Sequence, residues 1–114
     1  MKQRFRFLRF DIEDGEYSGI INAYKLSPKG TRIQLEIELE GSAFLLRPAS
    51  ISTDLTEKNV LFRYFDEAGY SMEDVNEISF DDLIGEEITF SIEHNLGKTV
   101  TFCNIAEIHR KENE

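Results

Sequence analysis

The sequence contains no tryptophan, one cysteine and two prolines, and its 13 lysines and arginines are outnumbered by 22 acidic residues. A single cysteine excludes an internal disulfide and fits a reducing compartment. No apolar run is long enough to cross a membrane, and the N-terminal segment is too charged to resemble a secretory signal. We therefore expect a cytoplasmic protein that does not contact membranes.

Catalytic and metal-binding motifs are also missing from the sequence. His94 and His109 stand outside any Cys-His or His-x-x-x-His pattern, and Cys103 has no recognisable base partner. The acidic clusters that begin at Asp11 and Asp81 lack the ligand spacing of an EF-hand calcium loop. These patterns predict a protein that is not an enzyme and that holds no metal ion or cofactor.

The net charge of −9 opposes a general attraction of the molecule to nucleic-acid phosphates. The charges are nevertheless segregated along the chain. Residues 1–10 carry four cations and no acid, and residues 25–34 carry three cations and no acid. Residues 71–90, in contrast, carry seven acids and no cation. This distribution permits a local basic surface on an acidic body.

Alternation of apolar and polar residues predicts antiparallel strands with one buried face. The clearest cases are residues 31–40 and 87–93, in which every second residue is aliphatic or aromatic. Residues 16–26, 43–47 and 99–108 are predicted as further strands. The residues expected to face the core from the two clearest strands are Ile33, Leu35, Ile37, Leu39, Ile88, Phe90 and Ile92.

One helix is predicted over residues 56–68, where apolar residues recur at helical spacing. Asp54 or Thr56 is expected to cap its start. Gly69 follows the helix at the position where a left-handed residue commonly ends it. Ser79 is expected to cap one further helical turn. The helix would place its apolar face on the core.

Glycine, proline and asparagine mark the expected reversals and irregularities. Residues 27–30 and 94–98 are predicted as the turns of two hairpins. Gly19 is expected at a bend or bulge, and a second bulge is expected near residues 103–104, where the alternation loses its parity. Residues 109–114 form a polar tail that we expect to be frayed.

Residues 1–13 combine basic and aromatic residues in a separate N-terminal strand or arm. Arg4 and Arg6 share one face of an extended segment, while Phe5 and Phe7 have the other parity. One interpretation is an edge strand whose aromatic side packs on the core. Another is an arm that contacts nucleic acid. An edge strand of this kind also offers a route to a homo-oligomer by strand addition.

The order of three strands, one helix and two strands is that of an OB-fold, a small five-stranded Greek-key barrel. Residues 1–114 are expected to form one such OB-like domain of a mainly β class, because the chain is long enough for one core and shows no linker. The N-terminal segment would add a strand, and the helix between the third and fourth strands would close the bottom of the barrel.

Short motifs along the same order give the chain a resemblance to a known group. The motifs are Asp14-Gly-Glu-Tyr17, Lys29-Gly30, Phe65-Asp-Glu-Ala-Gly69, Phe80-Asp-Asp-Leu-Ile-Gly85 and Asn104-Ile105. In order and spacing they resemble OB-fold single-stranded-DNA-binding proteins of phages and integrative mobile elements. The similarity extends over residues 14–108, although no single motif is specific.

This resemblance implies a ligand that lies across the second and third strands, between the loop joining strands one and two and the loop joining strands four and five. Cationic side chains there would contact the phosphates of the backbone, and aromatic rings would stack on the bases. The candidate nucleic-acid-binding residues are Arg4, Arg6, Tyr24, Lys25, Lys29, Arg32, Phe44 and Lys98. Acidic residues at positions 36, 38 and 40 of the second strand depart from the pattern, because their charges would repel a nucleic acid.

Two hypotheses follow from these features. The first is a binding module of a phage or mobile element that holds single-stranded nucleic acid weakly and without sequence preference. The alternative is an acidic protein-interaction or structural module, either a charge mimic or an assembly subunit, whose partner is a basic protein. Binding of single-stranded oligonucleotides at low salt would separate the two.

Overall fold

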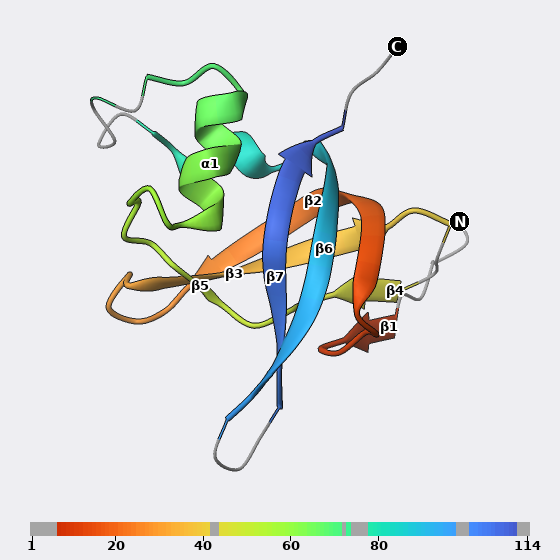
Figure 1. The fold of residues 1–114 in the computed structure, drawn as a ribbon. Coiled ribbons are helices and arrows are strands. Elements are labelled where there is room, and N and C mark those ends of the chain that lie inside the picture. The colour runs from red at the N-terminus through yellow and green to blue at the C-terminus, as the bar shows by residue number, and fades with distance from the viewer. Residues whose placement is uncertain (1–6, 42–43, 72, 74–77, 98–100, 112–114) are drawn as a thin grey trace.

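The computed structural model describes residues 7–41, 44–71, 73, 78–97 and 101–111. Within these residues the protein is mainly β, with a seven-stranded mixed sheet and one α-helix (Figure 1). The strands are β1 (Phe7–Arg9), β2 (Gly15–Leu26), β3 (Arg32–Leu39), β4 (Phe44–Leu46), β5 (Ile51–Ser52), β6 (Glu87–Leu96) and β7 (Thr101–Arg110). The helix α1 spans Val60–Glu67, and a 3₁₀ turn, η2, spans Phe80–Leu83. Neither helical segment in the described ranges has the length and apolar character that a membrane span requires.

The strands lie in the order β1-β4-β3-β2-β6-β7, and β5 also pairs with β3. The pairing of β1 with β4 is parallel, and the other pairings are antiparallel. The long strand β2 changes partner along its length: residues 15–20 pair with β6 and residues 19–26 pair with β3. Among the described residues the sheet stays open, with β1 and β7 at its edges. A backbone hydrogen bond of 2.8 Å from Ala49 to Cys103 links the segment after β4 to β7.

The strand count exceeds the five strands and one arm that the sequence predicts. The additional strand, β5, contains only Ile51 and Ser52 and pairs with the start of β3. Two residues are too few to show an alternating pattern, so this strand leaves no signal in the sequence. The first expected strand segment is present as β1, at the edge of the sheet, and residues 1–6 lie outside the described part of the chain.

The buried face predicted from alternation is confirmed. The residues Ile33, Leu35, Ile37, Leu39, Ile88, Phe90 and Ile92 are all buried in one core cluster. Leu61, Tyr64 and Phe65 cover this cluster from α1, as the helical spacing predicts. The helix contacts β7 near one end of the sheet, while the β6–β7 hairpin extends away at the opposite end (Figure 1).

The start of α1 differs from the prediction. Its N-cap is Asn59, whose side-chain oxygen accepts hydrogen bonds from the N–H groups of Leu61 and Phe62. The amide group of Asn59 donates to the carbonyls of Ser52 and Asp54, so one side chain holds both the helix and the preceding segment. This double use explains why the cap is not Asp54 or Thr56. Gly69 has the positive φ of 93° expected after the helix.

Gly19 is a point of close approach between strands, and the bulge of β2 lies elsewhere. The register between β2 and β3 shifts between Ile21 and Ala23. A Cβ atom at Gly19 would lie 2.6 Å from the carbonyl oxygen of Glu38 and 2.8 Å from Cγ2 of Ile37. The glycine is therefore required because the backbones of β2 and β3 leave no space for a side chain.

The C-terminal hairpin is longer and more regular than predicted. Strand β6 continues to Leu96, so His94 and Asn95 belong to the strand rather than to a turn. The register shift of β7 lies between Ile105 and Glu107, beyond the bulge expected at residues 103–104. The start of the expected frayed tail instead belongs to the sheet. Strand β7 ends at Arg110, and the N–H of Lys111 donates to the carbonyl of Glu87. Residues 112–114 of the expected frayed tail lie outside the described residues.

Candidate functional site

A groove beside the β2–β3 hairpin collects the cations predicted at its loop. Its volume is about 650 Å³, and we call it the basic groove. The lining residues are Lys25, Leu26, Ser27, Pro28, Arg32, Gln34 and Ser50. Lys25 pairs with Gln34 across the two strands, so their side chains leave the same face of the sheet. The structure thus brings together two of the predicted binding residues, Lys25 and Arg32.

The segment after β4 holds two lining residues of the basic groove in place through hydrogen bonds. The guanidinium of Arg32 donates from Nε to Ser50 Oγ at 3.0 Å and from Nη2 to the carbonyl of Ser50. Gln34 donates to the carbonyl of Pro48 at 3.1 Å. These bonds use two of the five guanidinium N–H donors and hold the planar group in place. Arg32 is therefore positioned to present further donors to an anion.

The aromatic residues predicted to stack on bases lie away from this groove. Tyr24 is on the core-facing side of β2, where its hydroxyl donates to Asp81 at 2.6 Å and its ring packs edge-on against Phe80. Phe44 is half-buried on β4, and Arg9 lies over its ring at 5.0 Å. The alternating sides of a strand explain the separation, because Tyr24 and Lys25 are neighbours in sequence.

The remaining predicted residues do not line the groove. Lys29 is exposed in the turn between β2 and β3, outside the set of lining residues. Arg4, Arg6 and Lys98 lie outside the described residues. Near the turn end of the described β6–β7 hairpin, Leu96 is 88% exposed and Phe102 is 47% exposed. Phe102 is an exposed aromatic residue that the sequence pattern assigned to a strand and did not single out as a binding residue.

Glu36 on β3 and Glu40 directly after it have cationic partners that reduce their repulsion of a nucleic acid. The side chain of Glu36 is only 12% exposed, and it accepts hydrogen bonds from Arg47 and Asn22. The Asn22 hydrogen bond, followed by Arg47, lowers the pKa of Glu36. Glu40 forms an ion pair of 3.0 Å with Lys111. Arg47, which follows β4, and Lys111, which follows β7, therefore offset part of the negative charge of these glutamates.

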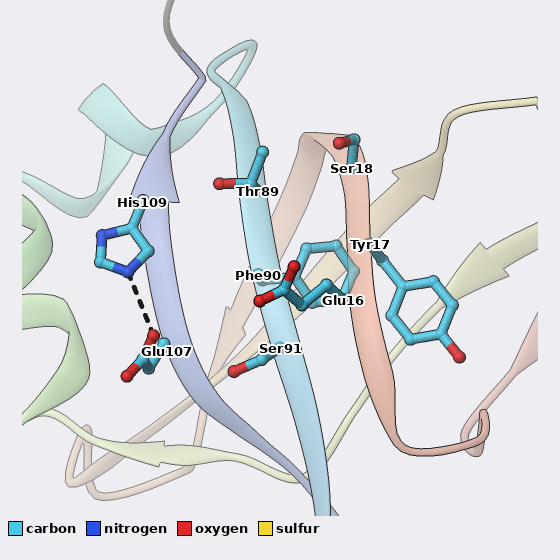
Figure 2. A pocket seen from close by; sticks show the side chains of 8 residues that line it. All are labelled: Glu16, Tyr17, Ser18, Thr89, Phe90, Ser91, Glu107 and His109. Carbon is cyan, nitrogen blue, oxygen red and sulfur yellow. Dashed lines mark hydrogen bonds and ion pairs between the residues drawn. The ribbon is translucent and has the colours of Figure 1, made fainter.

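A second surface, the polar trough, crosses β2, β6 and β7. Figure 2 shows its side chains, which are Glu16, Ser18, Thr89, Ser91, Glu107 and His109, with Tyr17 and Phe90 forming the rest of the lining. The trough has a volume of about 400 Å³. Thr89 pairs with His109 and Ser91 pairs with Glu107, so the polar groups stand in two rows across the strands. The trough presents hydroxyls and carboxylates, the groups that suit a cationic partner.

His109 joins the trough to the end of α1. Its Nδ1 lies 2.9 Å from Glu67 of the helix, and its Nε2 lies 3.3 Å from Glu107 on the same strand. The hydrogen bond with Glu67, followed by that with Glu107, raises the pKa of His109. A protonated imidazole at this position links α1 to β7 and offsets the charge of the two carboxylates.

The ion pair of His109 predicts a pH-dependent part of the stability. Because its pKa is raised in the folded state, the stabilisation is complete below the unfolded value of 6.5 and is lost as the pH rises through the folded pKa. The loss should stay below about 1 kcal/mol, since the side chains are largely exposed. Urea unfolding of the wild type and of His109→Gln across this range measures it, and the two curves should converge at high pH.

A Glu67→Gln variant provides the control for this assignment. The imidazole resonances of the two histidines can be followed by NMR, and the variant should move the pKa of His109 downward while leaving that of His94 in place. An unchanged His109 titration would contradict the proposed role of Glu67.

A third group of side chains escaped the sequence analysis. His94 bonds through Nδ1 to Asp14 and through Nε2 to Asp11 at 2.6 Å, and the nearby Cys103 is 5% exposed. The Asp11 and Asp14 hydrogen bonds raise the pKa of His94, the bond to His94 lowers the pKa of Asp11, and burial raises the pKa of the Cys103 thiol. His94 therefore has close partners in space, although it stands outside any Cys-His or His-x-x-x-His pattern in the sequence. The sequence gives no direct signal, because the aspartates precede His94 by about 80 residues.

Comparison of the chain with protein-family models finds no match, and comparison with curated proteins finds none.

Proposed function

We propose that the protein is a non-enzymatic module that binds single-stranded nucleic acid weakly and without sequence preference along the basic groove. The observation that carries this proposal is the convergence of Lys25 and Arg32, with the Arg32 guanidinium held by Ser50. A fixed guanidinium and a neighbouring ammonium supply contacts to phosphate that do not depend on base sequence. The partial neutralisation of Glu36 by Arg47 supports the same proposal, because it weakens repulsion at the adjacent surface.

We also propose that the sheet is a variant of the OB fold, as found in phages and mobile elements. This is supported by β2, which pairs with both β3 and β6, and by a helix that lies between the first group of strands and the last two. In such folds the binding face is flanked by two hairpin loops. The second of these would be the β6–β7 hairpin, where exposed Phe102 can offer a face for base stacking.

The proposal is tested by replacing Lys25, Lys29 and Arg32 together with alanine. Each phosphate contact to a single strand contributes about −0.7 to the slope of log affinity against log salt, so the variant should flatten this slope by about two units. Its affinity should fall most at low salt, where electrostatic attraction is strongest. The measurement is the fluorescence anisotropy of a labelled oligonucleotide of about thirty bases, titrated at a series of salt concentrations.

A matched control removes three cations elsewhere. Replacing Lys58, Arg63 and Arg110 with alanine changes the net charge equally but leaves the basic groove intact. The control should keep a salt slope close to that of the wild type. Equal losses in both variants would mean that net charge, rather than the groove, governs binding. Unchanged affinity in the triple variant would refute the assignment of Lys25 and Arg32 in the groove and of Lys29 in the adjoining turn.

The polar trough favours a second candidate function, in which the acidic surface binds a basic protein. Its specific support is the position of Glu16 on β2 and Glu107 on β7, on either side of β6 (Figure 2). Glu67, at the end of α1, adds a third carboxylate beside His109. Such carboxylates suit lysine and arginine side chains of a partner. The oligonucleotide titration separates the two functions, because a protein of this second kind would not bind the oligonucleotide at low salt.

A further inference from the structure

Three separate parts of the chain converge near the turn end of the β6–β7 hairpin. His94 on β6 stands directly opposite Cys103 on β7, so their side chains leave the same face of the two strands. Asp11 and Asp14 come from the segment between β1 and β2. The potential ligand atoms of Asp11, His94 and Cys103 all lie within 4.8 Å of one another. Oxygen, nitrogen and sulfur donors are thus collected at one point.

The two aspartates act differently on the imidazole of His94. The carboxylate of Asp14 accepts a hydrogen bond from Nδ1 of His94. The carboxylate of Asp11 lies 2.6 Å from Nε2 of the same ring and belongs to the cluster that includes Cys103. Histidines that bind a metal through one nitrogen commonly donate their other N–H to a carboxylate, which fixes the ring and its tautomer. Asp14 provides such a carboxylate, which leaves Nε2 directed at the other donors.

We infer that Asp11, His94 and Cys103 form a zinc-binding site, with Asp14 as the residue that orients His94. A set of one thiolate, one imidazole and one carboxylate suits zinc and its analogue cobalt. Calcium and magnesium prefer oxygen ligands alone, so they fit this set poorly. Three protein ligands leave the fourth tetrahedral position to water.

The placement of the donors is compatible with this coordination. Tetrahedral zinc, with bonds of about 2.0–2.3 Å, holds its ligand atoms about 3.5 Å apart, so the present cluster needs only a small rearrangement. Paired strands fix the backbones of His94 and Cys103, whereas the Asp11 side chain is 76% exposed and can rotate. The ion would replace the protons on Nε2 and on the thiol, which pass to solvent.

Zinc at this position would connect the segment before β2 to both strands of the hairpin. This inference is independent of nucleic-acid binding, since none of its ligands lines the basic groove. Its direct consequence is that metal should raise the melting temperature, because the ion binds only the folded arrangement of the three ligands.

The test uses the untagged, full-length protein, reduced and freed of metal with a chelator, and titrates it with Co²⁺. The expected result is one equivalent of Co²⁺ bound, with a thiolate-to-cobalt charge-transfer band and intense visible bands of tetrahedral cobalt. Zn²⁺ should remove these bands by displacement and should raise the melting temperature. A folded, reduced wild type that shows no thiolate band would overturn the inference.

Variants assign the ligands one at a time. Cys103→Ser should lose the charge-transfer band, and His94→Gln should lose the tetrahedral spectrum. Because either change can affect folding, the exposed Asp11→Asn and Asp14→Asn variants give a second test. Removing the orienting carboxylate of Asp14 should weaken Zn²⁺ binding by about 10- to 100-fold, and Asp11→Asn should weaken it at least as much.

The matched control is His109→Gln, which replaces the chain's other histidine; like His94, this histidine contacts two carboxylates. It should bind Co²⁺ with the spectrum and affinity of the wild type. Wild-type affinity in both Asp11→Asn and Asp14→Asn, or loss of binding in His109→Gln, would place the metal elsewhere and overturn the assignment.

Discussion

Replacing Phe65 with alanine should lower the free energy of unfolding by about 3–5 kcal/mol, a typical cost for removing a buried phenylalanine. Phe65 is 1% exposed, and its ring lies 5.6 Å from Tyr64, 5.1 Å from Tyr70 and 6.5 Å from Phe80. The substitution would leave a cavity where α1 and η2 meet, in addition to the loss of apolar burial. Such a loss is a large part of the stability of a single domain. Urea unfolding followed by circular dichroism measures it.

Phe102→Ala is the control for this effect, because it removes the same ring from a surface. Phe102 is exposed on β7, so its replacement should cost less than about 1 kcal/mol. If the two variants lose similar amounts of stability, Phe65 does not occupy the packed position described for it.

Gly19→Ala should be the most damaging change of a single methyl group in the sheet. Its Cβ would meet the carbonyl oxygen of Glu38 and the Cγ2 of Ile37, and a backbone atom cannot move aside without shifting β3. Overpacking of this kind costs about 1–3 kcal/mol, and we expect the upper part of this range because β2 is paired on both sides here. Thermal and urea unfolding give the loss.

Gly30 distinguishes this crowding from a purely conformational cost. It has a positive φ of 71°, and a Cβ there would meet no atom within 4 Å. Asparagine tolerates left-handed backbone, so Gly30→Asn should be milder than Gly30→Ala. At Gly19 the order should reverse, because a larger side chain only adds contacts. A milder effect of Gly19→Asn would contradict the steric explanation.

The regular parts of the fold were predictable because they follow the period of their side chains. Alternation identified the buried faces of β3 and β6, and helical spacing identified the residues by which α1 covers the core. The cap at Asn59 was missed because its second role, holding Ser52 and Asp54, depends on a contact made only after folding. The close approach at Gly19 was misassigned for a related reason, since a glycine in a strand can signal a bulge or crowding.

The candidate sites were predictable only where neighbours in sequence are neighbours in space. Lys25 and Arg32 flank one hairpin turn, so their convergence follows from local pairing. Tyr24 was grouped with them in the prediction, but it precedes Lys25 directly on β2, so alternation turns its side chain to the opposite face, toward Phe80 and Asp81. The cluster around His94 requires the β6–β7 register and a segment from the start of the chain.

The pairing of β2 with both β3 and β6 also constrains the order in which the sheet can form during synthesis. Its C-terminal half meets β3 through a short hairpin, which can form as soon as both strands have left the ribosome. Its N-terminal half must wait for β6, since Gly19 pairs with Ile88 near the other end of the chain. Until then the nascent chain exposes a strand edge able to join the wrong partner. The segment that carries α1 and η2 therefore sets how long this edge stays unpaired during synthesis.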